Sequence, residues 1–176
     1  RQAAGLCRDM TQLLPEGESF QSTLIAAPPG AGKTTLLREM VAALSNGSEE
    51  RAPLRVGIVD ERGELAGMYR GVPQLDVGFH TDVLDSCPKT LGIPMLMRSA
   101  NPQVIAVDEI TTAEDLTAMA AAANCGVALL ATIHALDEEE LRRKPLYPVL
   151  AASQVFRRLI TISVEAGQRR YQVRPL

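Results

Sequence analysis

The sequence has 176 residues, of which 46% are hydrophobic, and a formal charge of −3 from 18 basic and 21 acidic side chains. A chain of this length and composition can bury a full core, so it predicts one globular domain over residues 1–176 and excludes a disordered protein. The near-neutral charge argues against a strongly basic nucleic-acid binder, so we expect no nucleic-acid partner.

Four short apolar runs predict buried strands at 23–26, 56–59, 104–107 and 127–133. They are too short for independent helices and apolar on both faces, as strands of a covered parallel sheet are. Between them, apolar residues at three- and four-residue spacing predict amphipathic helices, one of them ending before Asn46-Gly47. The alternation predicts an α/β fold, with a mainly parallel sheet flanked by helices.

Glycine, proline and polar residues indicate the connections. Segments 45–53 and 70–90 are predicted as loops, and the second is long enough to have a function of its own. Thr111 and Glu114 are predicted to form the capping box of the helix that precedes the fourth strand, and Gly126 fits the left-handed residue just past its end.

The end of the chain predicts a β-hairpin, because the segments 159–164 and 170–173 flank the glycine-containing turn Ala166-Gly167-Gln168. The uncharged stretch 116–133 just reaches the length of a membrane span, but Asn124-Cys125-Gly126 divides it into a helix and a strand. The sequence therefore predicts no transmembrane segment and no signal peptide.

The cysteines and the first residue bear on the cellular setting. Cys7, Cys87 and Cys125 are odd in number and widely spaced, so we interpret them as free thiols of a cytosolic protein. Because the chain opens on Arg1, we expect it to be a fragment that lacks an upstream N-terminal region.

A phosphate-binding loop is predicted between the first strand and the first helix. Gly30 and Gly32 would let backbone N–H groups wrap a phosphate, Lys33 would bridge the β- and γ-phosphates, and the Thr34 hydroxyl would coordinate Mg²⁺. Ala27 stands where this motif usually has a glycine. The alternative is an ordinary glycine turn before a helix. The predicted nucleotide contacts are Pro29, Gly30, Ala31, Gly32, Lys33, Thr34 and Thr35.

Two adjacent carboxylates end the third predicted strand. Asp108 is placed to hold Mg²⁺, and Glu109 to polarise the water that attacks the γ-phosphate. A solvated strand end is the alternative, although buried strands rarely end in two acids without a reason.

Further polar groups are predicted at the same sheet edge, where ligands of open α/β sheets bind. Asp60, Glu61 and Glu64 follow the second strand and are either ligands of Mg²⁺ or water, or a solvated charge run. His134 follows the fourth strand, where it either senses the γ-phosphate or merely caps the strand. The arginines that could reach phosphates, here or in a neighbouring subunit, are Arg62, Arg70 and Arg98.

Five segments in order resemble the stage III sporulation protein AA family of ATPases, which is itself similar to type II/type IV secretion and pilus ATPases. They are A-P-P-G-A-G-K-T-T-L-L-R, V-G-I-V-D-E-R-G-E-L-A-G, T-D-V-L-D-S-C-P-K, M-R-S-A-N-P-Q-V-I-A-V-D-E-I and A-L-L-A-T-I-H-A. The resemblance covers about residues 20–140. It departs at Ala27 and at His80, where an arginine is expected.

The resemblance implies a RecA-like P-loop ATPase that uses ATP and Mg²⁺ to power a sporulation channel between mother cell and forespore. It implies a homo-hexamer with membrane-embedded channel proteins as partners, in the mother-cell cytoplasm and peripheral to the forespore membrane. It assigns Walker A to Gly30, Gly32, Lys33 and Thr34, Walker B to Asp108 and Glu109, and further catalytic roles to Glu61, Glu64 and His134.

Two other functions remain open at this point. One is a RecA-like nucleic-acid-dependent ATPase, which only a locally basic last third would favour. The other is a nucleotide-gated scaffold with little turnover. The basic residues concerned are Arg142, Arg143, Lys144, Arg157, Arg158, Arg169 and Arg170.

Overall fold

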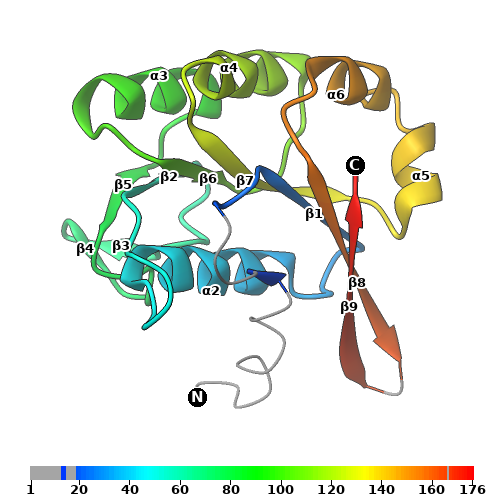
Figure 1. Cartoon of the computed structure of the whole chain (residues 1–176), viewed down its shortest axis with the longest axis horizontal. Helices are drawn as coiled ribbons and strands as arrows, with labels where there is room; N and C mark the ends of the chain where they lie inside the picture. The colour runs from blue at the N-terminus through cyan, green and yellow to red at the C-terminus, as the bar shows by residue number, and fades with distance from the viewer. Residues whose placement is uncertain (1–12, 15–18, 166) are drawn as a thin grey trace.

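A seven-stranded sheet runs through the centre of the molecule, with helices on both faces (Figure 1). This computed structural model describes residues 13–14, 19–165 and 167–176. The strands of the sheet are β1 (Thr23–Ala27), β2 (Val56–Asp60), β5 (Thr81–Asp85), β6 (Val104–Val107), β7 (Ala128–His134), β8 (Arg158–Glu165) and β9 (Gln168–Pro175). Their order is β5-β2-β6-β7-β1-β8-β9, and every neighbouring pair is parallel except β8 and β9. The mainly parallel α/β fold and the C-terminal hairpin are confirmed.

The helices divide the core into two layers. One face of the sheet is covered by α2 (Lys33–Asn46), and the other by α3 (Lys89–Ser99), α4 (Ala113–Asn124) and α6 (Tyr147–Ser153), with α5 (Glu138–Arg143) following β7 (Figure 1). Successive residues of a strand point to opposite faces, so Leu24 of β1 joins the layer of α4 while Ile25 joins that of α2. The four predicted strands agree with β1, β2, β6 and β7 within one residue at each end.

The prediction of a loop over 70–90 is wrong for much of its length. It contains β5 and the first two residues of α3, and its start overlaps a small antiparallel pair, β3 (Met68–Tyr69) and β4 (Val72–Pro73). The edge strand β5 is half exposed and carries polar side chains, Asp82 and Asp85 among them, so it lacks the apolar run that marks the central strands. The connection predicted at 45–53 is confirmed except at its start, because α2 continues to Asn46.

The capping box of α4 is shifted by one residue from the predicted pair Thr111 and Glu114. Thr112 Oγ1 accepts from the N–H of Asp115 at 3.1 Å, and Asp115 Oδ2 accepts from the N–H of Thr112 at 3.1 Å. The prediction failed because aspartate, although shorter than glutamate, also reaches back to this N–H. Gly126 follows the helix with φ +86°, as predicted.

Two further observations bear on the sequence predictions. Within the described residues, no helix combines the length and the apolar character that a membrane crossing requires. Cys87 and Cys125 are free thiols, and Cys7 lies outside the described residues.

Candidate functional site

Three neighbouring strands bring the predicted site residues to one edge of the sheet. Strands β6, β7 and β1 are adjacent and parallel, so the residues that follow their carboxyl ends meet there. They surround a pocket of about 330 Å³. Its lining is Pro29, Gly30, Gly32, Lys33, Thr34, Thr35, Arg62, Glu64, Asp108, Glu109, His134 and Arg169. Of the predicted loop contacts, only Ala31 turns away, into the core beside α2.

The loop before α2 has the backbone geometry that a phosphate cradle needs. Gly30 and Gly32 have φ of +75° and +98°, values at which a side chain would be strained. Gly32 is the N-cap of α2, so the first N–H groups of this 14-residue helix face the pocket. Ala27 is the buried last residue of β1 and has no positive φ, so a glycine is not required at that position.

Lys33 crosses the pocket and is only 7% exposed. Its Nζ donates to the carbonyl of Pro28 at 3.1 Å and lies 2.9 Å from Nδ1 of His134. Burial lowers the pKa of Lys33, and the nearby carboxylates of Asp108 and Glu109 partly oppose that shift. Because a lysine ammonium only donates, Nδ1 of His134 accepts and its Nε2 carries the proton.

Asp108 is held by hydroxyl groups from two other elements. Thr34 Oγ1 donates to Oδ2 at 2.9 Å, and Thr132 Oγ1, from within β7, donates to Oδ1 at 2.6 Å. A hydroxyl and a carboxylate oxygen side by side suit Mg²⁺, which prefers oxygen ligands and keeps several waters and phosphate oxygens. Among the described residues, no group of three or more His, Cys, Asp or Glu is placed to hold a metal ion.

Glu109 is fixed in an uncommon backbone conformation. Its φ is +43°, a region that costs a residue other than glycine about 1 kcal/mol or more. Its N–H donates to Thr132 Oγ1 at 2.8 Å. Its carboxylate is engaged at both oxygens, with Arg62 Nη1 2.7 Å from Oε2 and His134 Nε2 3.1 Å from Oε1. Lys33, His134 and Glu109 therefore form one chain of contacts across the pocket.

The acidic residues that follow β2 have different environments and different roles. Asp60 is 1% exposed, and its carboxylate accepts from the N–H groups of Glu64, Leu65 and Ala66 at 2.8–3.0 Å. It therefore shapes the loop and does not face the pocket. Glu64 lines the pocket, whereas Glu61 lies outside that lining in an ion pair with the buried Lys89.

The other arginines singled out in the sequence lie away from the site. Arg70 stacks on the ring of Tyr69, with its Cζ 5.3 Å from the ring centroid, and Arg98 is exposed in the last turn of α3. Of the three, only Arg62 lines the pocket.

Two residues of the site were missed from the sequence: Arg169, which lines the pocket, and Thr132, which holds Asp108 from behind the lining. Thr132 is a polar residue inside an apolar strand, two positions before His134, and this interruption was the available signal. Arg169 lies in β9, far from any motif, and only the fold shows that it reaches the glycine loop.

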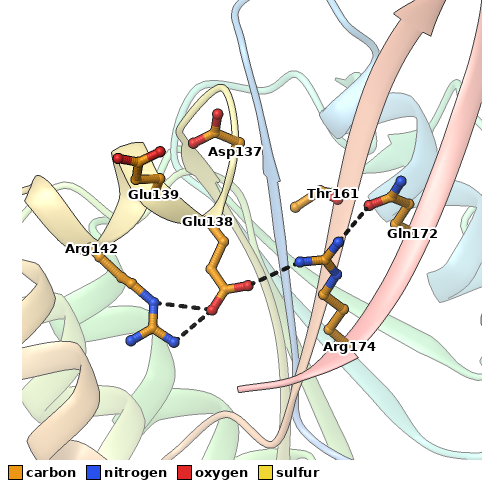
Figure 2. A pocket seen from close by; sticks show the side chains of 7 residues that line it. All are labelled: Asp137, Glu138, Glu139, Arg142, Thr161, Gln172 and Arg174. Carbon is orange, nitrogen blue, oxygen red and sulfur yellow. Dashed lines mark hydrogen bonds and ion pairs between the residues drawn. The ribbon is translucent and has the colours of Figure 1, made fainter.

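A second, larger pocket of about 410 Å³ lies between α5 and the hairpin. Figure 2 shows the carboxylate of Glu138 between two guanidinium groups, those of Arg142 and Arg174. Arg142, by hydrogen bonding and charge, and Arg174 lower the pKa of Glu138. These charges compensate one another, and the contacts of Glu138 with Arg142 and Arg174 link β9 to α5.

The site combines a glycine loop between the buried strand β1 and a helix with two acids that follow β6, a parallel strand separated from β1 by β7. This arrangement defines a RecA-like P-loop fold. The fold is similar to that of the ATPase DotB of Legionella pneumophila, with a TM-score of 0.64 and 19% identity over 90% of this chain and 46% of that one. It is also similar to the pilus retraction motor PilT with bound ADP, with a TM-score of 0.60 and 17% identity over 90% of this chain and 48% of that one.

The sequence identifies the family within this class. It matches the family described as sporulation stage III, protein AA over residues 2–173. It is 39% identical over 167 residues to stage III sporulation protein AA of Bacillus subtilis strain 168, across 95% of this chain and 54% of that protein. The chain therefore belongs to the sporulation stage III protein AA family, and it spans about half the length of this relative.

Proposed function

We propose that this chain is the catalytic part of a Mg²⁺-dependent ATPase that powers a channel between mother cell and forespore. The observation that carries the proposal is the contact of Thr34 Oγ1 with Asp108 Oδ2 at 2.9 Å. It joins the end of the phosphate loop to the end of β6, as shared coordination of a nucleotide-bound cation requires.

Each pocket residue has a role in this proposal. The N–H groups of the glycine loop and Lys33 bind the phosphates, and Thr34 and Asp108 hold Mg²⁺, which neutralises phosphate charge when it is bound. Glu109 accepts a proton from the water that attacks the γ-phosphorus in line, while the bond to the leaving β-phosphate oxygen breaks. His134, between Lys33 and Glu109, reports whether the γ-phosphate is present.

The two glutamates of the acidic segment take different parts. Glu64, which lines the pocket, orients water near the γ-phosphate. Glu61 positions that segment through its ion pair with Lys89, whose side chain is 7% exposed.

Substitutions at Glu109 and Lys33 test the assignment. Glu109→Gln should bind ATP and Mg²⁺ but lose about 10²-fold or more in turnover, because it cannot accept the proton. Lys33→Ala should lose binding as well. The measurements are steady-state phosphate release and ATP affinity, each with and without Mg²⁺. Hydrolysis by Glu109→Gln at nearly the parental rate would contradict the catalytic role.

The assembly is proposed to be a homo-hexamer with nucleotide at the subunit borders, on the cytoplasmic side of the mother cell and bound to membrane-embedded channel proteins. The ATPase rate and the molar mass in solution should rise together when ATP or the partner proteins are added. Stimulation by DNA or RNA would favour a nucleic-acid motor instead. Tight ATP binding without turnover, even with the partners present, would favour a nucleotide-gated scaffold.

A further inference from the structure

The side chain of Arg169 reaches the glycine loop from the far end of the sequence. Its guanidinium lies directly against Gly32: a Cβ placed on that glycine would be 2.7 Å from Cζ of Arg169. It lines the same pocket as Lys33, Thr34 and Asp108. The residue is exposed, so nothing in the core forces the side chain into this position.

The hairpin that carries Arg169 is anchored on both faces. Arg169 is paired with Val164 of β8, and β8 lies beside β1, the strand that leads into the glycine loop. Side chains two apart on a strand share a face, so Arg169 is on the same face as Tyr171, which packs on the core beside α2. From the opposite face, Arg174 contacts Glu138 of α5 (Figure 2).

Arg169 differs from the other two cations of the pocket in having no fixed partner. Lys33 contacts Pro28 and His134, and Arg62 is paired with Glu109. Within the described residues, no hydrogen bond or ion pair is formed by the Arg169 side chain. The charge of Arg169 lowers the pKa of Glu39 on α2, against the larger effect of burial, which raises it.

The electrostatics of this position favour an anion. The guanidinium adjoins the N-terminus of α2, the positive end of the helix dipole, and two positive groups repel unless a negative group lies between them. Arg169 is on the loop side of the pocket, against Gly32, while the γ-phosphate side is occupied by Arg62, Glu109 and His134. In P-loops the backbone cradles the α- and β-phosphates, and the lysine reaches on to the γ-phosphate.

We infer that Arg169 contacts the α- or β-phosphate of the bound nucleotide, from the same chain as the glycine loop. The inference rests on the proposed nucleotide-binding function. It makes the C-terminal hairpin a third element of the phosphate site, beside the glycine loop and the acid-ended strand. It also gives one arginine of the basic C-terminal third a role in nucleotide binding. The positive charge of this residue then does not indicate a nucleic-acid partner.

The test is the affinity of the whole chain for ATP and for ADP. Arg169→Ala should weaken both by about tenfold to a hundredfold, as expected for the loss of a charged hydrogen bond. Arg169→Lys should recover part of the affinity, because lysine keeps the charge without the planar pair of donors. Arg170→Ala removes the same charge from the opposite face of the hairpin and should stay within about twofold of the parent.

The outcomes separate this inference from the function on which it rests. If the parent binds neither ATP nor ADP, both are wrong. If the parent binds them and Arg169→Ala binds equally well, only the role of Arg169 is wrong. Loss of ATP affinity alone would also overturn it, because it would place the contact at the γ-phosphate. A purely structural role would lower the unfolding temperature of the nucleotide-free protein while leaving its increase with ADP unchanged.

Discussion

Thr132 shows how one hydroxyl group can set the geometry of two acids. It donates to Asp108 and accepts from the N–H of Glu109, so it fixes both residues from a neighbouring strand. Its side chain is fully buried, and water cannot replace it. Thr132 is therefore a positioning residue of the proposed ATPase, although it lines no pocket itself.

Replacing Thr132 by valine keeps the shape and removes the hydroxyl. We expect about tenfold or more loss of turnover with a smaller change in ATP affinity, because Glu109 would be misplaced. The free energy of unfolding should fall by about 1–3 kcal/mol, because the partly buried N–H of Glu109 and the carboxylate of Asp108 each lose a partner. Phosphate release and denaturant unfolding measure the two effects. Thr161→Val on β8 is the control, because Thr161 makes no side-chain hydrogen bond within the described residues; equal effects in both variants would contradict the positioning role.

The site residues that could be predicted from the sequence are those that belong to short contiguous motifs. Gly30, Lys33 and Thr34 are recognisable because the loop and helix that arrange them are contiguous in the chain. Thr132 and Arg169 act across strand neighbours that lie far apart in sequence, so the order of strands in the sheet had to be known first. The different roles of Asp60 and Glu64 likewise follow from the burial of Asp60. A run of acidic residues in the sequence does not reveal which side chain is buried.

At the scale of elements, the segment after β2 is organised by the carboxylate of Asp60. It accepts hydrogen bonds from the backbone N–H groups of Glu64, Leu65 and Ala66. Arg38 of α2 adds to this by donating to the carbonyls of Glu64 and Leu65. These contacts keep Glu64 and Arg62 beside the pocket.

Asp60→Ala would leave these three N–H groups, two of which are buried, without their acceptor. We expect a loss of about 2–4 kcal/mol in unfolding free energy, together with weaker activity because Arg62 and Glu64 lose their support. Asp85→Ala, at the exposed end of β5, should change stability by no more than about 0.5 kcal/mol. Chemical denaturation of the two variants gives the comparison, and similar losses in both would show that Asp60 has no special role.

The elements that could not be predicted from sequence patterns are those whose residues do not follow a regular apolar pattern. β5 is an edge strand, half exposed, and its polar residues hide the strand pattern. α3 contains Pro94, which argues against a helix, and yet buries Ile93 and Leu96. By contrast, β1, β2, β6 and β7 are covered on both sides, and the resulting apolar runs made them predictable from the chain alone.

At the scale of the whole molecule, the strands that end at the pocket are the innermost strands of the sheet. β6, β7 and β1 lie between β2 on one side and β8 on the other, whereas β5 and β9 form the edges. Buried central strands open only when the entire domain unfolds, but edge strands can open locally.

Hydrogen–deuterium exchange should reveal this difference. In the nucleotide-free protein, the amides of β1, β6 and β7 should exchange slowest, at the rate of global unfolding, and those of β9 much faster. Comparable rates in β9 and β1 would contradict it. If β1, β6 and β7 exchange slowest, as expected, the strands that hold Asp108 and Lys33 stay intact until the whole domain unfolds. Heating should accordingly abolish catalysis in the same transition that unfolds the domain, whereas β9, the edge strand that bears Arg169, can detach and return many times before that point.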